Sequence, residues 1–188
     1  MLSTTSSVLP RSRFRRLYRR LVDTVQGVRP RHSDRAWVES ILQPGELELW
    51  LRLSGPDQCH AIQVARSVEA RLAGTPYAGD GRWLGAALLH DVGKVEAGLG
   101  ILERAVATLL GKATSVDRAR RWARAEAASI RRLGLYLTHG SVGAAAIRAA
   151  GGREEIAAWA EVHQALPCPA MDLLPVPVVH ALSDADLE

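Results

Sequence analysis

The chain has 188 residues, of which 24 are lysine or arginine and 20 are aspartate or glutamate, giving a net charge of +4 and a pI near 9.6. This length suits one domain with short extensions, and the two cysteines stand too far apart for a CxxC zinc or redox motif. This cysteine usage suits a reducing compartment, so we expect a cytoplasmic protein. The longest apolar stretches are too short or too interrupted by proline to cross a membrane, and the positive net charge favours anionic partners.

The N-terminal third is predicted to form a basic arm and a short helical preface. Over residues 11–25, arginines interleave with apolar residues spaced three and four apart, which predicts a basic amphipathic helix. Its apolar stripe is expected to dock on the domain, and contact with nucleic acid or a membrane surface is the alternative. Two further helices, over residues 34–42 and 46–53, are separated by a Gln-Pro-Gly turn.

The rest of the chain is predicted to be helical throughout. A Ser-Gly-Pro-Asp start at 54–57 opens a long helix that Gly74 ends, and the helix over residues 82–90 is apolar on all sides, as a buried central helix would be. Residues 98–136 predict two helices, the second rich in arginine. The last predicted helices are THGSVGAAAI, REEIAAWAEVHQ and a segment from about Pro177 to the end.

No segment alternates with period two, so the predicted fold class is all-α, a single bundle of eight to ten helices. We divide the chain into residues 1–54, which hold the basic arm and the preface, and residues 55–188, which hold the main domain.

Four of the six histidines fall within or at the end of apolar helical segments, namely His60, His90, His139 and His163. An imidazole in such a place needs a polar partner. For a single histidine an ordinary role in the core is the better explanation. Four of them, together with an adjacent His-Asp pair, favour a shared metal ion.

The pair His90-Asp91 stands at the end of the predicted central helix. Adjacent side chains point in different directions, so both can face one ion only if the backbone turns there. Gly93 allows that turn, because glycine permits a backbone that a side chain would hinder. Imidazole with carboxylate suits divalent Fe, Mn, Co, Ni or Zn, and the lack of cysteine ligands argues against a closed structural zinc site.

Five segments in this order, CHAIQVARSVEARL, AALLHDVGK, THGSVGAAAI, AEVHQ and ALSDADLE, resemble the HD superfamily of metal-dependent phosphohydrolases. The resemblance covers about residues 55–188, and the family signature is a histidine, a His-Asp pair and a closing aspartate. It implies an HD-domain helical bundle, here with an N-terminal helical extension.

Carried over by position, the resemblance implies that a metal ion is held by His60, His90, Asp91 and Asp186. Asp184 is the competing choice for the closing aspartate. The two aspartates lie two residues apart and so on different sides of a helix. Asp186 is favoured because the family usually has Ala-Asp at this position.

Relatives of the HD-GYP type and similar cyclic-dinucleotide hydrolases hold a second metal with further histidines, and His139 and His163 stand where those would be. The resemblance therefore implies one or two divalent ions per chain. This chain departs from that type at His163-Gln164-Ala165, where such relatives often have His-His and an acidic residue, and no GYP motif follows.

The function that the resemblance implies is hydrolysis of a phosphodiester or nucleotide phosphate by a metal-activated water. Asp91 and Lys94 are the expected catalytic residues, although Lys94 has the alternative of a solvated lysine after a helix. The expected substrate is a nucleotide or a cyclic dinucleotide, and the arginines of residues 118–132 either contact its phosphates or form a solvated face. One bound ion favours nucleotidase chemistry, whereas two favour phosphodiesterase chemistry.

Two other classes of function stay open at this point. One is a catalytically silent HD-like regulatory or interaction module, in which the bundle persists and the ligands have decayed. The other is a nucleic-acid or membrane-surface binder that acts through the basic N-terminal helix. The oligomeric state is not predicted.

Overall fold

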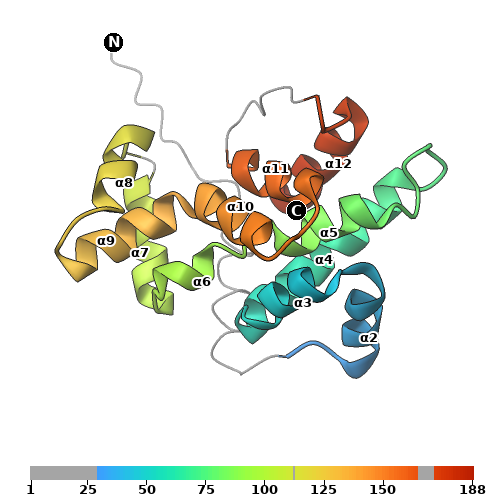
Figure 1. Cartoon of the computed structure of the whole chain (residues 1–188), viewed down its shortest axis with the longest axis horizontal. Coiled ribbons are helices and arrows are strands. Elements are labelled where there is room, and N and C mark those ends of the chain that lie inside the picture. The colour runs from blue at the N-terminus through green and yellow to red at the C-terminus, as the bar shows by residue number, and fades with distance from the viewer. Residues whose placement is uncertain (1–28, 112, 165–171) are drawn as a thin grey trace, which may run out of the picture.

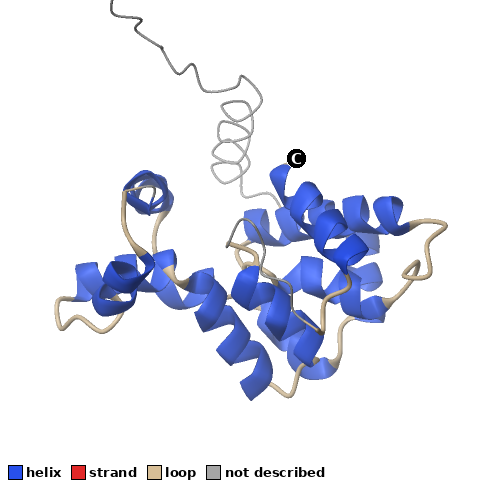
Figure 2. Cartoon of the chain, turned by 90° about the horizontal axis from the view of Figure 1, so that it is seen from above, coloured by secondary structure: helices blue, strands red, loops and turns tan. Residues whose placement is uncertain are grey.

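The computed structural model describes residues 29–111, 113–164 and 172–188 (Figure 1). Figure 2 shows helices and loops in this part of the chain and no strand, which confirms the predicted all-α class. The predicted basic helix over residues 11–25 lies outside the described residues. The helices are α2 (His32–Ile41), α3 (Pro44–Leu51), α4 (Gly55–Leu72), α5 (Gly81–Leu89), α6 (Lys94–Ala97), α7 (Ile101–Gly111), α8 (Val116–Trp122), α9 (Ala128–Leu137), α10 (His139–Ala149), α11 (Glu154–Val162) and α12 (Val176–Leu187).

Helix α5 lies at the centre of the main bundle, as its sequence predicts. Every residue from Trp83 to Leu89 is buried, and the helix packs against α4 on one side and α11 on another. Helices α2 and α3 contribute Val38 and Trp50, both fully buried, to the same hydrophobic core. The core therefore extends from the predicted preface to α12.

Local signals in the sequence set the ends of these helices. The Ser54 hydroxyl accepts a hydrogen bond from the Asp57 backbone N–H and begins α4, and Gly74, with φ +75°, follows its end. Helix α3 has Pro44 in its first turn and a capping box formed by Gln43 and Glu46. The position of Gly74 confirms the predicted end of α4, whereas Pro44 and Gly45 of the predicted turn are the first residues of α3, so the break before this helix falls at Leu42 and Gln43.

Residues 94–137 form a separate lobe, which lies to one side of the main bundle in Figure 1. The prediction of two helices over residues 98–136 is wrong, because this stretch contains α7, α8 and α9, and the short α6 precedes it. Gly98, with φ +57°, ends α6, and the Ser115 hydroxyl caps a new helix at α8.

The arginine-rich segment of this lobe folds back on itself, so that α8 packs on α9. Gly134 makes the approach possible, since a Cβ there would lie 2.1 Å from the Ala123 backbone nitrogen. A small core of Ala97, Leu99 and Ala107 holds the lobe together. Helix α9 then leads through Thr138 directly into α10, which returns the chain to the main bundle.

Across residues 29–111, 113–164 and 172–188, no helix combines the length and the hydropathy that a bilayer span requires.

Candidate metal centre

Six side chains that the sequence singles out come together where the main helices end. His60 lies within α4, His90 follows the last residue of α5, and Asp91 is the next residue. His139 begins α10, His163 follows α11, and Asp186 lies in the last turn of α12. The six form two adjacent groups of three, each with one potential ligand atom per residue.

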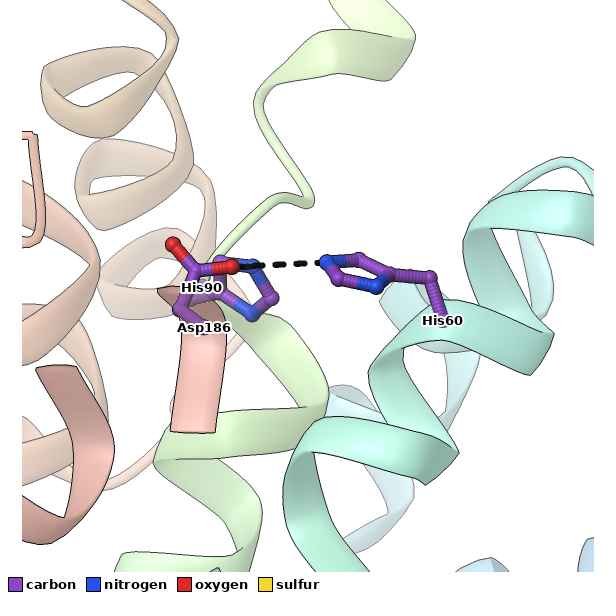
Figure 3. Close-up of side chains that lie close together, drawn as sticks. All are labelled: His60, His90 and Asp186. Atoms are coloured by element: carbon purple, nitrogen blue, oxygen red, sulfur yellow. Dashed lines mark ion pairs between the residues drawn. The ribbon is translucent and has the colours of Figure 1, made fainter. Parts of the chain in front are cut away.

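The first group is His60, His90 and Asp186, whose ligand atoms lie within 4.8 Å of one another. Figure 3 shows the three side chains pointing toward one another from α4, α5 and α12. The Asp186 Oδ1 lies 3.4 Å from the His60 Nε2 and 3.3 Å from the His90 Nε2. Two imidazoles and one carboxylate oxygen therefore converge on one position.

The second group is Asp91, His139 and His163, again within 4.8 Å of one another. The Asp91 Oδ1 lies 3.1 Å from the His139 Nε2 and 3.7 Å from the His163 Nε2. The other oxygen of the same carboxylate, Oδ2, lies 3.4 Å from the His90 Nε2. Asp91 thus joins the two groups, with one oxygen toward each.

Three of the four histidines share one hydrogen-bond arrangement, in which Nδ1 contacts the carbonyl three residues earlier. The bonds are His90 to Ala87 at 2.8 Å, His139 to Tyr136 at 2.7 Å and His163 to Ala160 at 2.7 Å. Since a carbonyl only accepts, each Nδ1 is the donor, and Nε2 is left to face the carboxylates, with a lone pair when the ring is neutral and an N–H when it is protonated. Such bonds fix the tautomer and the orientation of metal-binding imidazoles.

Helix ends supply these acceptors. Ala87, Tyr136 and Ala160 lie in the last turns of α5, α9 and α11, where carbonyl groups have no partner within the helix. A histidine that directly follows an apolar helix can reach such a carbonyl and aim its other nitrogen at the interior. Sequence patterns alone do not reveal these backbone acceptors, although a histidine just past a helix end is a pattern that could have pointed to them.

The inward nitrogens crowd around the carboxylates and one another. The His90 Nε2 is buried and makes no hydrogen bond of good geometry within the described residues, although it lies 3.3 Å from the Asp186 Oδ1. The His139 Nε2 lies 3.1 Å from the Asp91 Oδ1 and 3.3 Å from the His163 Nε2. A divalent ion at each group would satisfy these nitrogens, and a set of imidazole and carboxylate donors suits such ions.

The electrostatics of the site favour positive charge. Burial opposes protonation of His90, but the carboxylates of Asp91 and Asp186 outweigh it and raise the pKa of His90 to about 10. Burial would raise the pKa of Asp186, yet His90 and His60 hold it well below its usual range. The pKa of Asp91 is also held far below its usual range, because Lys94 and His90 outweigh its burial.

His139 behaves in the opposite way. Burial lowers its pKa, and the nearby Lys94 ammonium acts in the same direction. The neutral imidazole is therefore the stable form, which is the form that coordinates a metal ion.

Lys94 is an ion-paired residue rather than a solvated one. Its ammonium contacts the Asp91 Oδ2, and its side chain is only 14% exposed. The lysine of the HDVGK segment thus lies beside the carboxylate that joins the two groups.

Solvent reaches the site from the side of the first group. The side chains of Asp186 and His60 are 31% and 19% exposed, whereas those of Asp91 and His163 are 7% and 4% exposed. A small molecule would therefore approach from the side of His60 and Asp186.

Gly93 matters for a reason other than backbone freedom. Its φ of −64° is ordinary for any residue. A Cβ at this position would lie 2.0 Å from the His139 carbonyl oxygen and 2.6 Å from the Gly143 nitrogen. The glycine therefore allows the turn after Asp91 to pass close to the start of α10, which brings the second group together.

Asp184, the remaining histidines of the described residues, Cys59 and the arginines of α8 and α9 lie outside both groups. Asp184 is 61% exposed and contacts Arg71, with 3.6 Å between the Nη1 and Oδ2 atoms. His32 and His180 are exposed on the surface, and Cys59 is half-buried. The arginines of α8 and α9 are exposed, apart from Arg132. Arg132 is half-buried and donates hydrogen bonds to the Ala97 and Gly98 carbonyls at the end of α6.

No family model, curated protein or solved structure matches this chain. Its function is therefore inferred from the site itself.

Proposed function

We propose that this protein is a metal-dependent phosphohydrolase with an HD-type centre. The observation that carries the proposal is the set of inward Nε2 atoms, held by the Nδ1 bonds of three histidines, around carboxylates from α5 and α12. The resemblance of the HDVGK segment and its flanking motifs to the HD superfamily supports the same function. The two cysteines lie far apart in the sequence, which suits a reducing compartment and supports a cytoplasmic location.

His60, His90 and Asp186 would hold one divalent ion, and Asp91, His139 and His163 would hold a second. Candidate ions are Fe, Mn, Co, Ni and Zn. Such ions supply positive charge that stabilises a reacting phosphoryl group and lower the pKa of water.

The residues of the chain position these charges and receive the substrate. Asp91 holds the two groups in a fixed relation, because each of its oxygens faces a different group. The Lys94 ammonium adds a positive charge next to Asp91, where it would stabilise a substrate phosphate oxygen. The more exposed flank at His60 and Asp186 is where the phosphate would enter.

Two complete groups favour a phosphodiester substrate such as a cyclic dinucleotide, because two metal ions can stabilise both the attacking and the leaving oxygen. A nucleotide phosphomonoester is the expected substrate if only the first group binds metal. A catalytically silent module is disfavoured, since such a module would have no use for two intact sets of inward ligands.

The test begins with the full chain purified without chelators and analysed for its metals. We expect one to two divalent ions per chain, and hydrolysis of a bis-aryl phosphate, nucleotides or cyclic dinucleotides that stops when the ions are removed. His90→Ala and Asp91→Ala should lose both metal and activity. His180→Ala, which changes an exposed histidine of α12, should keep both.

A purified protein that holds no divalent ion, or whose phosphatase activity survives complete metal removal, would contradict the proposal. Metal binding without activity on any of these phosphate esters would favour the silent module instead.

A further inference from the structure

Asp186 lies in the sequence between Asp184 and Glu188, and side chains of α4 contact both of these residues. The Arg71 guanidinium contacts Glu188 through Nη2 and lies 3.6 Å from Asp184 through Nη1. The Ser67 hydroxyl donates to the Glu188 Oε2 at 2.9 Å, and the Arg71 Nε donates to the Ser67 oxygen at 3.2 Å. We call Ser67, Arg71, Asp184 and Glu188 the Arg71 clamp.

Helical spacing separates the clamp from the ligand. Asp184 and Glu188 are four residues apart and share one face of the last part of α12, whereas Asp186, two residues from each, projects from a different side. On α4, His60 and Ser67 are seven residues apart and Arg71 follows one turn later, so these residues lie along one face. One face of α4 thus supplies both a ligand of the first group and the clamp.

Helix α12 packs on α4, and Asp186 projects from it toward His60 and His90. A metal ligand must be held to within about 0.5 Å of its productive position. The contacts of α4 on both sides of Asp186 restrict the turn that carries this carboxylate.

We propose that Arg71 is a positioning residue for the metal site, which holds the last turn of α12 so that Asp186 reaches His60 and His90. This inference depends on the proposed metal-binding function. It assigns no contact between Arg71 and the substrate.

In Arg71→Ala, the loss of positive charge and the loss of the clamp contacts predict opposite changes in affinity for a divalent ion. Removing a cation from the neighbourhood of a metal site lowers electrostatic repulsion, so the charge change alone would tighten binding of a divalent ion. Removing the clamp releases Asp186 and weakens binding. A loss of affinity in Arg71→Ala therefore comes from lost positioning or lost packing and not from the change of charge.

The test is titration of chelator-stripped full-length protein with Co²⁺, followed by visible absorption, at low salt. We expect Arg71→Ala to weaken the Co²⁺ site that contains Asp186 about tenfold, the lower end for loss of an outer-shell partner. Arg71→Lys should recover part of the loss. Arg35→Ala, which removes an exposed arginine paired with Glu39 on α2, should bind like the wild type.

Salt gives a further readout that a general loss of packing would not change. At 1 M NaCl the Debye length falls to about 3 Å, so the exposed ion pairs of the clamp are screened in the wild type and the difference between the two proteins should shrink. Equal or tighter Co²⁺ binding by Arg71→Ala at low salt would overturn the inference.

Hydrogen exchange of the metal-free proteins separates failure of the clamp from failure of the proposed function. Amides of the last turn of α12 should exchange several-fold faster in Arg71→Ala than in wild type or Arg35→Ala. If these amides exchange equally fast in Arg71→Ala and in the wild type, the clamp is overturned, whatever the Co²⁺ titration shows. Wild-type protein that binds no Co²⁺, with faster exchange in the variant, would leave a structural clamp and overturn both the metal site and the positioning role.

Discussion

At the scale of single residues, the closing aspartate shows how one position in a helix decides a role. Asp184 and Asp186 have the same chemistry, but only the Asp186 carboxylate lies within 3.4 Å of the histidines, and Asp184 faces Arg71. Sequence reasoning left both open and favoured Asp186 by resemblance alone. The direction in which α12 presents each residue is what separates them.

Exchanging each carboxylate for an amide tests this assignment. Asp186→Asn should weaken divalent metal binding at least about 100-fold, more than loss of an outer-shell partner does, because a charged ligand is removed. Asp184→Asn should have a much smaller effect through the clamp. Calorimetric titration with Mn²⁺ measures both, and a larger loss in Asp184→Asn would contradict the assignment.

Gly93 allows a second prediction at this scale. Gly93→Ala would place a Cβ 2.0 Å from the His139 carbonyl oxygen, so α10 must move away from the turn after Asp91. We expect a loss of at least about 2 kcal/mol in the free energy of unfolding, as for other overpacked sites, together with loss of the second metal.

Urea denaturation and metal analysis measure these two effects of Gly93→Ala. The matched control is Gly100→Ala, where the added Cβ would meet only the Glu103 carboxylate at an ordinary 3.5 Å. A Gly93→Ala protein as stable as this control would show that the contact between the turn and α10 is not required.

At the scale of elements, a buried carboxylate joins α3 to the start of α11. Glu46 is fully buried, and its oxygens accept hydrogen bonds from the Arg153 backbone and guanidinium and from the Gln43 backbone. Burial would raise the pKa of Glu46, but its bonds to Arg153 and Gln43 outweigh it and lower the pKa. One residue therefore caps one helix and anchors another.

Glu46→Gln should lower the free energy of unfolding by about 3 kcal/mol at pH 7, because it leaves the Arg153 charge without its buried partner. A carboxylate whose pKa is lowered on folding stabilises the fold above its unfolded pKa, near 4.5, and this stabilisation is lost as pH falls below that value. The difference between variant and wild type should therefore narrow between pH 5 and about pH 3. Urea unfolding over this range measures it, and a constant difference would contradict the account.

The lobe of α6 to α9 shows where element prediction fails. Helical spacing continues over most of residues 98–136, and the arginines of its second part form one run, so these patterns predict fewer helices than form. The breaks occur at Gly98, at Ser115 and after Trp122, and they are stabilised by packing of α8 on α9, which no local pattern reveals. Tertiary packing overrides propensity here.

At the scale of the whole molecule, the site ties together helices that are distant in the chain. Its six residues come from α4, α10, α12 and the ends of α5 and α11, so metal binding should stabilise the bundle as a unit. A ligand that binds only the folded state at 100 times its Kd adds about 2.7 kcal/mol. For a chain of this size that corresponds to a rise in Tm of about 5 °C or more.

Thermal unfolding with saturating Mn²⁺ and with a chelator measures this shift. His90→Ala should show a smaller shift than the wild type, because it lacks a ligand of the first group and keeps the second, and His180→Ala should show the wild-type shift. An unchanged Tm in wild-type protein would mean that the two groups do not bind this metal in the folded state.

The sequence by itself determined the helical class and the burial of the α5 segment, and it singled out the histidines and aspartates that the structure brings together. Those follow from local physics: hydrophobic period, turn residues, and the scarcity of polar imidazoles in apolar helices. It also narrowed the site to a few histidines and aspartates.

Only the tertiary structure decided how these residues meet. It set which aspartate faces the histidines, how Asp91 divides its oxygens between two groups, and that the carbonyls of Ala87, Tyr136 and Ala160 orient the imidazoles. The reason is geometric: each contact depends on the relative placement of helices joined by long stretches of chain, and that placement is fixed by packing of the whole core rather than by any local pattern of residues.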